Sequence, residues 1–246
     1  MRVLVFDVWG DYAHFKKRYT TTSPLTHSIP PRTTIVGLIS AIAGLGRNEY
    51  QERFKDKSKI ALRLLNPVKK SRISISLIST KNEHLAAPPL VNYFKQHTLI
   101  NFEFLKDPKY RLYLFHSDKQ FYERLRELLG EHKSVYTPAL GLSGLIGNFR
   151  YIDEYDAEPR VPGSHGEYLE MNSVVPIRNS GTDKPLAKVQ PEPDQKYSLE
   201  TVPSLMKADR EVEEYLEILV EEEGHPIKAQ PSMYWEVGDG TRVVPF

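Results

Sequence analysis

The sequence predicts an α+β fold with a ferredoxin-like βαββαβ core over residues 1–152 and an irregular, acidic portion over residues 153–246. The core is predicted by the order of its apolar segments, which is strand, helix, strands, helix, strand. That order matches a split βαβ unit, in which an antiparallel sheet carries its helices on one face. The second portion is predicted by a change in composition, since acidic residues and spaced prolines replace the apolar runs from Asp153 onward.

The first strand and the first helix are the most apolar segments. Residues Arg2–Val8 are dense in β-branched and large apolar side chains, which is typical of a strand covered on both faces. Residues Ile35–Leu45 form a helix that is too apolar to face water. Pro30 and Pro31 forbid helix before it, and one of the threonines that follow can cap its first amides.

The other core elements follow from alternation or from helical spacing. Residues 73–77 alternate apolar and polar side chains, as a half-exposed strand does. Phe121, Tyr122, Leu125 and Leu128 recur at helical spacing before Gly130. We therefore expect a helix at 119–131 and strands at 60–65, 73–77, 102–105, 110–115 and 149–152.

The acidic C-terminal portion is expected to contain one helix and to pack on the core. Between residues 207 and 223, Val212, Tyr215, Leu216, Leu219 and Val220 recur at helical spacing over an acidic outer face. Short strands are possible at 174–177 and 188–189.

Composition excludes several classes of protein. The 246-residue chain has 40% hydrophobic and 26% charged residues, and no apolar run is long enough to cross a bilayer. The N-terminus lacks a basic region followed by an apolar signal core, so we expect a cytoplasmic protein. The chain has no cysteine, which excludes disulfides and thiolate chemistry.

The net charge of +1 hides an uneven distribution. Residues 1–150 hold 24 Lys and Arg against 12 Asp and Glu, whereas residues 151–246 hold 9 against 20. A basic half suits a polyanionic partner, because each neutralised phosphate releases counterions. We expect the acidic portion to face away from that partner.

The loop from Gly10 to Arg32 is the first candidate site, because it combines basic, aromatic and hydroxyl side chains. Such a mixture suits phosphates and stacked bases. The helix that follows adds exposed amides and a positive dipole end, and Arg32 adds a fixed charge. The alternative is a surface loop whose Phe15 merely packs. The candidate contacts are Tyr12, His14, Phe15, Lys16, Lys17, Arg18, Tyr19, Thr20, Arg32 and Thr33.

A glycine-rich segment, Gly141–Gly147, is the second candidate site. Its glycines allow backbone amides to approach a phosphate closely, with Gly141, Ser143 and Gly144 as candidate contacts. It lacks the Gly-x-Gly-x-x-Gly pattern and the P-loop lysine, and its apolar Leu142, Leu145 and Ile146 favour a packed turn instead. Lys70 and Arg72 could line the same RNA-binding surface as these two candidate sites. The alternative is that they form a solvated strand end.

Four patches of the sequence carry a resemblance to a known family. They are Phe6–Phe15 with Thr20–Pro24 and Ile29–Ile39, Leu65–Ser74, Phe102–Arg111, and Tyr136–Ser143. In order and spacing they resemble the Cas5 family of CRISPR-associated proteins, and the first looks like its type I-B branch. The resemblance covers about residues 1–152.

This resemblance implies an RNA-recognition-like core with a β-hairpin extension at about residues 70–104. It further implies a non-catalytic Cascade subunit that caps the 5′ handle of the CRISPR RNA. The implied protein partners are a Cas7-like backbone subunit and a Cas8-like large subunit, with target DNA contacted indirectly. No membrane partner and no cofactor is expected.

An enzymatic alternative remains open. The type I-C relatives cut the guide precursor with a metal-free site of tyrosine, lysine and histidine, and here His14, His27, His97 and His116 are candidate bases, with Tyr12, Tyr19 and Lys16 as partners. No spacing selects a set among them, and no metal-ligand pattern occurs. A third possibility is a single-strand RNA-binding module outside CRISPR systems.

Overall fold

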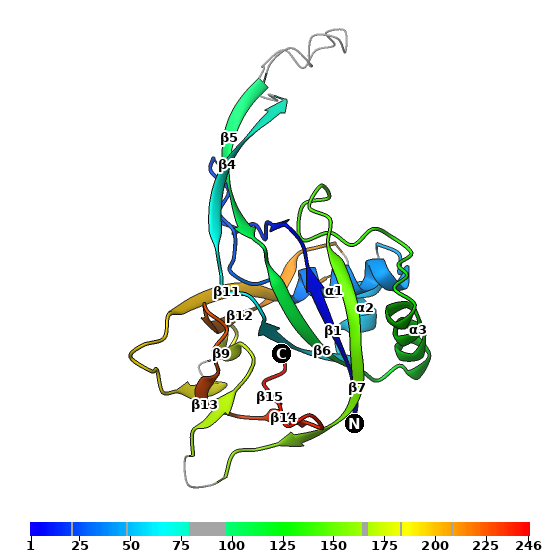
Figure 1. Cartoon of the computed structure of the whole chain (residues 1–246), viewed down its shortest axis with the longest axis vertical. Coiled ribbons are helices and arrows are strands. Elements are labelled where there is room, and N and C mark those ends of the chain that lie inside the picture. Colours follow the sequence, from blue (N-terminus) through cyan, green and yellow to red (C-terminus); the bar gives the residue numbers. More distant parts are fainter. Residues whose placement is uncertain (21, 48, 79–96, 164–166, 183, 208) are drawn as a thin grey trace.

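A six-stranded antiparallel sheet forms the centre of the computed structural model, which describes residues 1–20, 22–47, 49–78, 97–163, 167–182, 184–207 and 209–246. Its strands lie side by side in the order β15-β14-β7-β1-β6-β3 (Figure 1). Their bounds are β1 Arg2–Trp9, β3 Ser58–Leu64, β6 Lys109–His116, β7 Asn148–Arg160, β14 Tyr234–Val237 and β15 Arg242–Val243.

Both faces of this sheet are covered over part of its area. On one face Leu4, Phe6 and Val8 of β1 pack in the main core with α1 (Arg32–Ala43) and α3 (Lys119–Gly130). On the other face Val3 and Val5 pack with Trp235 of β14 in a second cluster. The apolar run at the N-terminus is therefore buried on both sides, as predicted.

The core elements follow one another in the predicted order. The chain runs β1, α1, β3, β6, α3, β7, with the five-residue helix α2 (Tyr50–Phe54) between α1 and β3. α1 begins earlier than expected, at Arg32, and Pro31 is its N-cap residue. No side chain of the described residues caps it, so the predicted threonine cap is wrong. α3 is capped by Asp118, whose carboxylate accepts a 3.1 Å hydrogen bond from the Phe121 amide.

A two-stranded hairpin leaves the body of the molecule between β3 and β6. It pairs β4 (Lys70–Ile78) with β5 (His97–Lys106), and β2 (Tyr12–Ala13) pairs with the base of β5. The two long strands extend away from the rest of the chain (Figure 1). The described strands lie where the extension was expected, and its residues 79–96 are outside the described residues.

The C-terminal portion is built of strands. β8 (Leu169–Met171), β10 (Ala187–Val189) and β13 (Ile227–Pro231) form one small sheet, and β9 (Val175–Asn179), β11 (Tyr197–Met206) and β12 (Val212–Glu221) form another. β7 runs through the boundary expected at residue 152, and β14 and β15 extend the central sheet. The two portions therefore share one sheet.

The predicted helix at 207–223 is wrong, because this segment contains β12, the middle strand of its sheet. Leu216, Ile218 and Val220 are buried at a spacing of two residues, which is the period of a strand. Tyr215 and Leu219 are half-buried at the alternate positions, on the other face. Apolar residues on both faces of one strand produced the apparent helical spacing. No helix occurs among the described residues after β7.

None of the helices in the described ranges combines the length and hydrophobicity needed to cross a membrane.

Candidate nucleic-acid interface

The loop between β1 and α1, residues 10–31, is a folded segment tied to two others. The His14 amide donates to the Leu140 carbonyl at 3.0 Å, which joins the loop to the glycine-rich segment. Glu103 of β5 joins it to the hairpin, because its carbonyl bonds His14 Nδ1 at 2.7 Å and its carboxylate accepts from the Thr26 amide at 3.3 Å. The structure therefore brings together the first loop, the glycine-rich segment and the base of the hairpin.

His14, Phe15 and Thr20 lie inside this folded loop, so their predicted roles as direct contacts are wrong. Phe15 is 2% exposed and packs in the main core, as the alternative interpretation held. His14 is 1% exposed, and burial lowers the pKa of His14, which favours the neutral ring. The Thr20 hydroxyl closes a turn by donating to the Lys17 carbonyl and accepting from the Leu25 amide.

Arg32 is also buried, and its predicted contact with a phosphate is wrong. Its guanidinium donates to the carbonyls of Phe54, Ser58, Ser204 and Phe246 and to the Ser58 hydroxyl, at 3.0 to 3.3 Å. Burial lowers the pKa of Arg32, yet an arginine remains a cation at neutral pH. The side chain joins α2, β3, β11 and the C-terminal residue instead of facing solvent.

Lys17 and His27 are held by a buried carboxylate that sequence reasoning missed. Glu200 of β11 lies 2.9 Å from Lys17 Nζ and 2.7 Å from His27 Nδ1, and it accepts from the Ser28 amide and hydroxyl. Burial opposes its ionisation, but the hydrogen bonds from His27 and Lys17 lower the pKa of Glu200 to about 2. Lys17 is therefore committed to an internal ion pair, and the expectation that the acidic portion faces away is wrong at this point.

Lys16, Arg18 and Tyr19 form the exposed tip of the loop. Tyr19 is 75% exposed, and Lys16 is also exposed. Arg18 donates to the Tyr215 hydroxyl at 3.0 Å from the surface. Solvent reaches these three side chains and, in part, the half-buried Tyr12 and Lys17.

A hollow of about 410 Å³ lies at the start of α1. Two predicted site residues from distant parts of the chain, Thr33 and Gly141, line it together. The Thr34 amide donates to the Pro31 carbonyl at 2.9 Å, so within the described residues only the amides of Arg32 and Thr33 lack an acceptor in the first turn of α1. The volume is within the range of small-molecule sites.

Ten further residues line this hollow and were not among the predicted contacts, and four of them bring larger side chains from other segments, namely Tyr50, Gln51, Met206 and Arg210. Gln51 is 8% exposed, and its Nε2 has no hydrogen-bond acceptor in the described part of the chain. A buried amide donor without a partner is costly unless a ligand or water satisfies it. No pattern in the sequence links Gln51 to Arg210, because only folding brings them together.

The glycine-rich segment has packed glycines at its two ends and exposed residues between them, with Leu145 half-buried. Gly141 has φ of 101°, and a Cβ there would lie 1.9 Å from the His14 carbonyl oxygen, so only glycine fits. Ser143 and Gly144 are exposed, and a Cβ at Gly144 would meet nothing within 4 Å. Leu142 and Ile146 are 39% and 65% exposed, so the expected inward packing of these two side chains is wrong.

Lys70 and Arg72 are exposed on β4 near the base of the hairpin. Lys70 Nζ lies 3.7 Å from Glu103, and Arg72 lies opposite Glu103 in the strand register. Both can reach solvent on the side of the hairpin that the first loop joins.

The histidines considered as bases are dispersed. His116 is buried and bonded to the backbone of Arg53 and Asp118, and His97 lies at the far end of the hairpin from its base. Within the described ranges, no group of three or more His, Asp or Glu side chains could hold a metal ion. The expectation of a metal-free protein stays a prediction.

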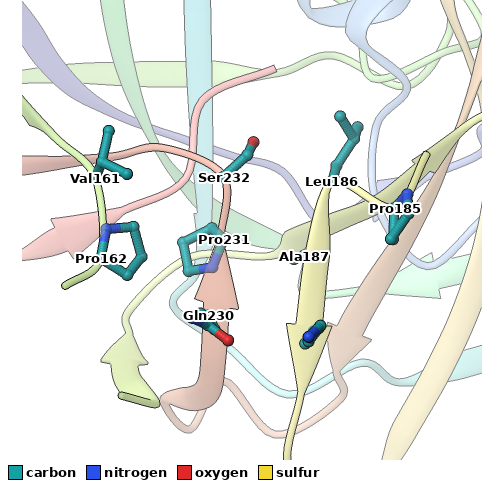
Figure 2. Close-up of a pocket in the computed structure, with 9 residues that line it drawn as sticks. Val161, Pro162, Pro185, Leu186, Ala187, Gln230, Pro231 and Ser232 are labelled. Carbon is teal, nitrogen blue, oxygen red and sulfur yellow. The ribbon is translucent and has the colours of Figure 1, made fainter. Parts of the chain in front are cut away.

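A second hollow, of about 270 Å³, lies in the C-terminal portion (Figure 2). β10 and β13 line it together with Val161 and Pro162. None of the predicted site residues lines this hollow, and its walls are rich in proline and aliphatic side chains.

Comparison with known proteins gives the family of the chain. A CRISPR-associated protein from Archaeoglobus fulgidus has a similar structure, with a TM-score of 0.56 and 16% identity over 99% of this chain and 98% of that one. A chain of a CRISPR RNA-guided surveillance complex is also similar, with a TM-score of 0.54 and 11% identity over 94% and 90%. At these identities the likeness concerns the fold. No curated protein matches the chain in sequence.

The model of the family described as CRISPR-associated protein Cas5 matches residues 3–212. This match extends over most of the chain, and so the chain belongs to the Cas5 family of CRISPR-associated proteins.

Proposed function

We propose that this chain is a non-catalytic, I-B-like subunit of a Cascade-type complex that binds and caps the 5′ handle of the CRISPR RNA. The observation that carries the proposal is the hollow at the start of α1. Thr33, Gly141 and Gln51 line it, and the side-chain Nε2 of Gln51 has no acceptor among the described residues. Family membership supports the CRISPR role, and the surveillance complex with a similar chain supports an assembly with RNA.

The hollow would take one splayed nucleotide of the handle. The Thr33 amide and the Arg210 guanidinium suit a phosphate, and the ring of Tyr50 suits a base. Gln51 would donate from Nε2 to an acceptor on the base or the phosphate. Lys16, Arg18 and Tyr19 at the exposed tip, with Ser143 and Gly144, would hold the neighbouring nucleotides.

We also assign the core to the ferredoxin-like class. The strand order β7-β1-β6-β3, with α1 and α3 on one face, supports this assignment. The hairpin would contact a Cas7-like backbone subunit, because Ile73, Leu77 and Leu99 are 37%, 39% and 73% exposed on it. A Cas8-like large subunit is the further partner proposed, with target DNA reached through the assembly.

Endoribonuclease activity on the guide precursor is the competing function. Its candidate bases His14 and His27 are buried and bonded within the protein, which favours binding over cutting. Incubation of the purified chain with labelled precursor RNA in EDTA separates the two. A single cut within the repeat, lost in His27→Ala, would replace the proposal with the enzymatic one.

The binding test compares the 5′ handle with a scrambled sequence of equal length. Gln51→Leu and Arg210→Gln should each weaken handle binding roughly tenfold in fluorescence anisotropy, because each removes a donor from the hollow. Lys188→Ala, at the second hollow, is the matched control and should bind as the parent does. Equal affinity for handle and scrambled RNA would instead support a general single-strand binder.

A further inference from the structure

The sheet face opposite the helices carries a row of charged side chains in strand register. Arg63 of β3 lies opposite Arg111 of β6, Arg111 lies opposite Asp7 of β1, and Asp7 lies opposite Arg150 of β7. These four strands are neighbours (Figure 1). Neighbouring strands are about 4.8 Å apart, so the three arginines gather within a short distance.

This row lies outside the second apolar cluster. Val3, Val5 and Tyr113 on the same face are buried under Trp235, whereas the side chain of Arg150 is 63% exposed and that of Arg111 is 24% exposed. One end of the sheet face is thus closed by the second apolar cluster. At the other end Arg150 is exposed, and Arg111 and Arg63 are half-buried.

The positive charge of the row is only partly balanced. Asp7 accepts two hydrogen bonds from Arg111, at 2.7 and 3.1 Å, and lies 3.5 Å from Arg150. Asp239, in the turn after β14, adds a weaker electrostatic attraction to Arg111. No ion pair joins Arg63 to a carboxylate among the described residues. Like charges directly opposite each other destabilise a sheet, and an anionic ligand would remove that cost at Arg63 and Arg111.

An aromatic side chain and a further cation adjoin the row. Trp9 is two residues after Asp7 and therefore shares its face, and Lys109 lies opposite Trp9 with Nζ 5.9 Å from the centre of the indole ring. An acidic protein surface would need the arginines but not the indole. Stacked bases need both, since arginine and aromatic planes hold unpaired bases on open sheets.

We propose that this open sheet face binds single-stranded nucleic acid at a site separate from the hollow at α1. The arginines would hold the phosphodiester backbone, and Trp9 would stack on a base. RNA and DNA share this chemistry, so the test uses both.

Fluorescein-labelled U12 and dT12 should bind the full chain in fluorescence anisotropy, with affinity falling as salt rises. Arg150→Ala and Arg63→Ala should each weaken binding roughly threefold to tenfold and lower the salt slope by about one. Arg124→Ala removes an exposed arginine from α3, on the opposite face, and should leave binding unchanged. Trp235 is fully buried, so quenching of tryptophan fluorescence on binding should report Trp9.

The same measurements in a Lys16→Ala/Tyr19→Ala/Gln51→Leu background separate this site from the handle site. Quenching and the effect of Arg150→Ala should persist there, and they should persist even if handle binding fails its own test. Equal affinities of Arg150→Ala and Arg124→Ala would overturn the proposal. Binding of polyglutamate with no binding of either oligonucleotide would also overturn it, in favour of an acidic protein partner.

Discussion

The polar side chains of the first loop fall into two groups, those bonded inside the protein and those that reach solvent. Lys17, His27 and Arg32 are bonded inside the protein, whereas Lys16 and Tyr19 reach solvent. The sequence does not distinguish the basic residues of the two groups, because it does not show whether a carboxylate from another segment will pair with a given cation. Glu200 is the residue that decides the fate of Lys17, and it comes from the C-terminal portion.

Glu200→Gln should lower the free energy of unfolding by roughly 3 kcal/mol at pH 7, because the pKa of Glu200 falls from 4.5 to about 2 on folding. A lowered carboxyl pKa stabilises the fold above the unfolded pKa, and this stabilisation is lost as the pH falls from about 4.5 towards 2. Urea denaturation should therefore show the variant and the parent converging in acid. Glu211→Gln, at an exposed ion pair, should match the parent at both pH values. A Glu200→Gln curve equal to the parent curve at pH 7 would contradict the role of the buried network.

At the scale of elements, apolar periodicity predicts the core well and the acidic portion badly. β1 and β6 are short runs rich in β-branched and large apolar residues, and α3 carries its apolar residues at helical spacing, so the types of these elements follow from local sequence. β12 carries apolar residues on both of its faces, with Leu216, Ile218 and Val220 buried on one and Tyr215 and Leu219 half-buried on the other. A pattern of that kind fits helix and strand equally, and only the neighbouring strands decide between them.

Leu216→Ala should lower the free energy of unfolding by about 2–5 kcal/mol, because Leu216 of β12 is 6% exposed in the main core. Leu199→Ala makes the same chemical change on β11, where the side chain is 58% exposed, and should change stability by less than about 0.5 kcal/mol. Chemical denaturation of both variants measures the difference. Equal losses of unfolding free energy in Leu199→Ala and Leu216→Ala would contradict the strand assignment of β12.

At the scale of the whole molecule, the acidic portion completes the basic one. β14 and β15 extend the central sheet, and Lys55 pairs with Glu213 at 2.9 Å across the two portions. Arg32 lies where β11 and the C-terminal residue meet α2 and β3. The uneven charge along the sequence therefore supports internal pairing as well as the exposed basic tip.

Arg32→Ala should destabilise the whole chain by roughly 3 kcal/mol or more, because several buried acceptors lose their donor together. Lys16→Ala should leave the melting temperature unchanged while weakening binding of the handle RNA. Thermal unfolding and anisotropy on the two variants test this division of roles. If Arg32→Ala kept the stability of the parent and bound RNA more weakly, Arg32 would instead be a direct RNA contact.

The sequence by itself determined the family, the order of the core elements and the position of the hairpin, because these depend on local apolar patterns and on motifs. The tertiary structure decided which cations remain exposed, which donors meet at the hollow, and whether residues 212–221 form a strand. Those outcomes depend on contacts between segments far apart in the chain, such as Lys17 with Glu200 and Thr33 with Gly141. No local pattern records such contacts, because burial and charge pairing arise only when the segments pack.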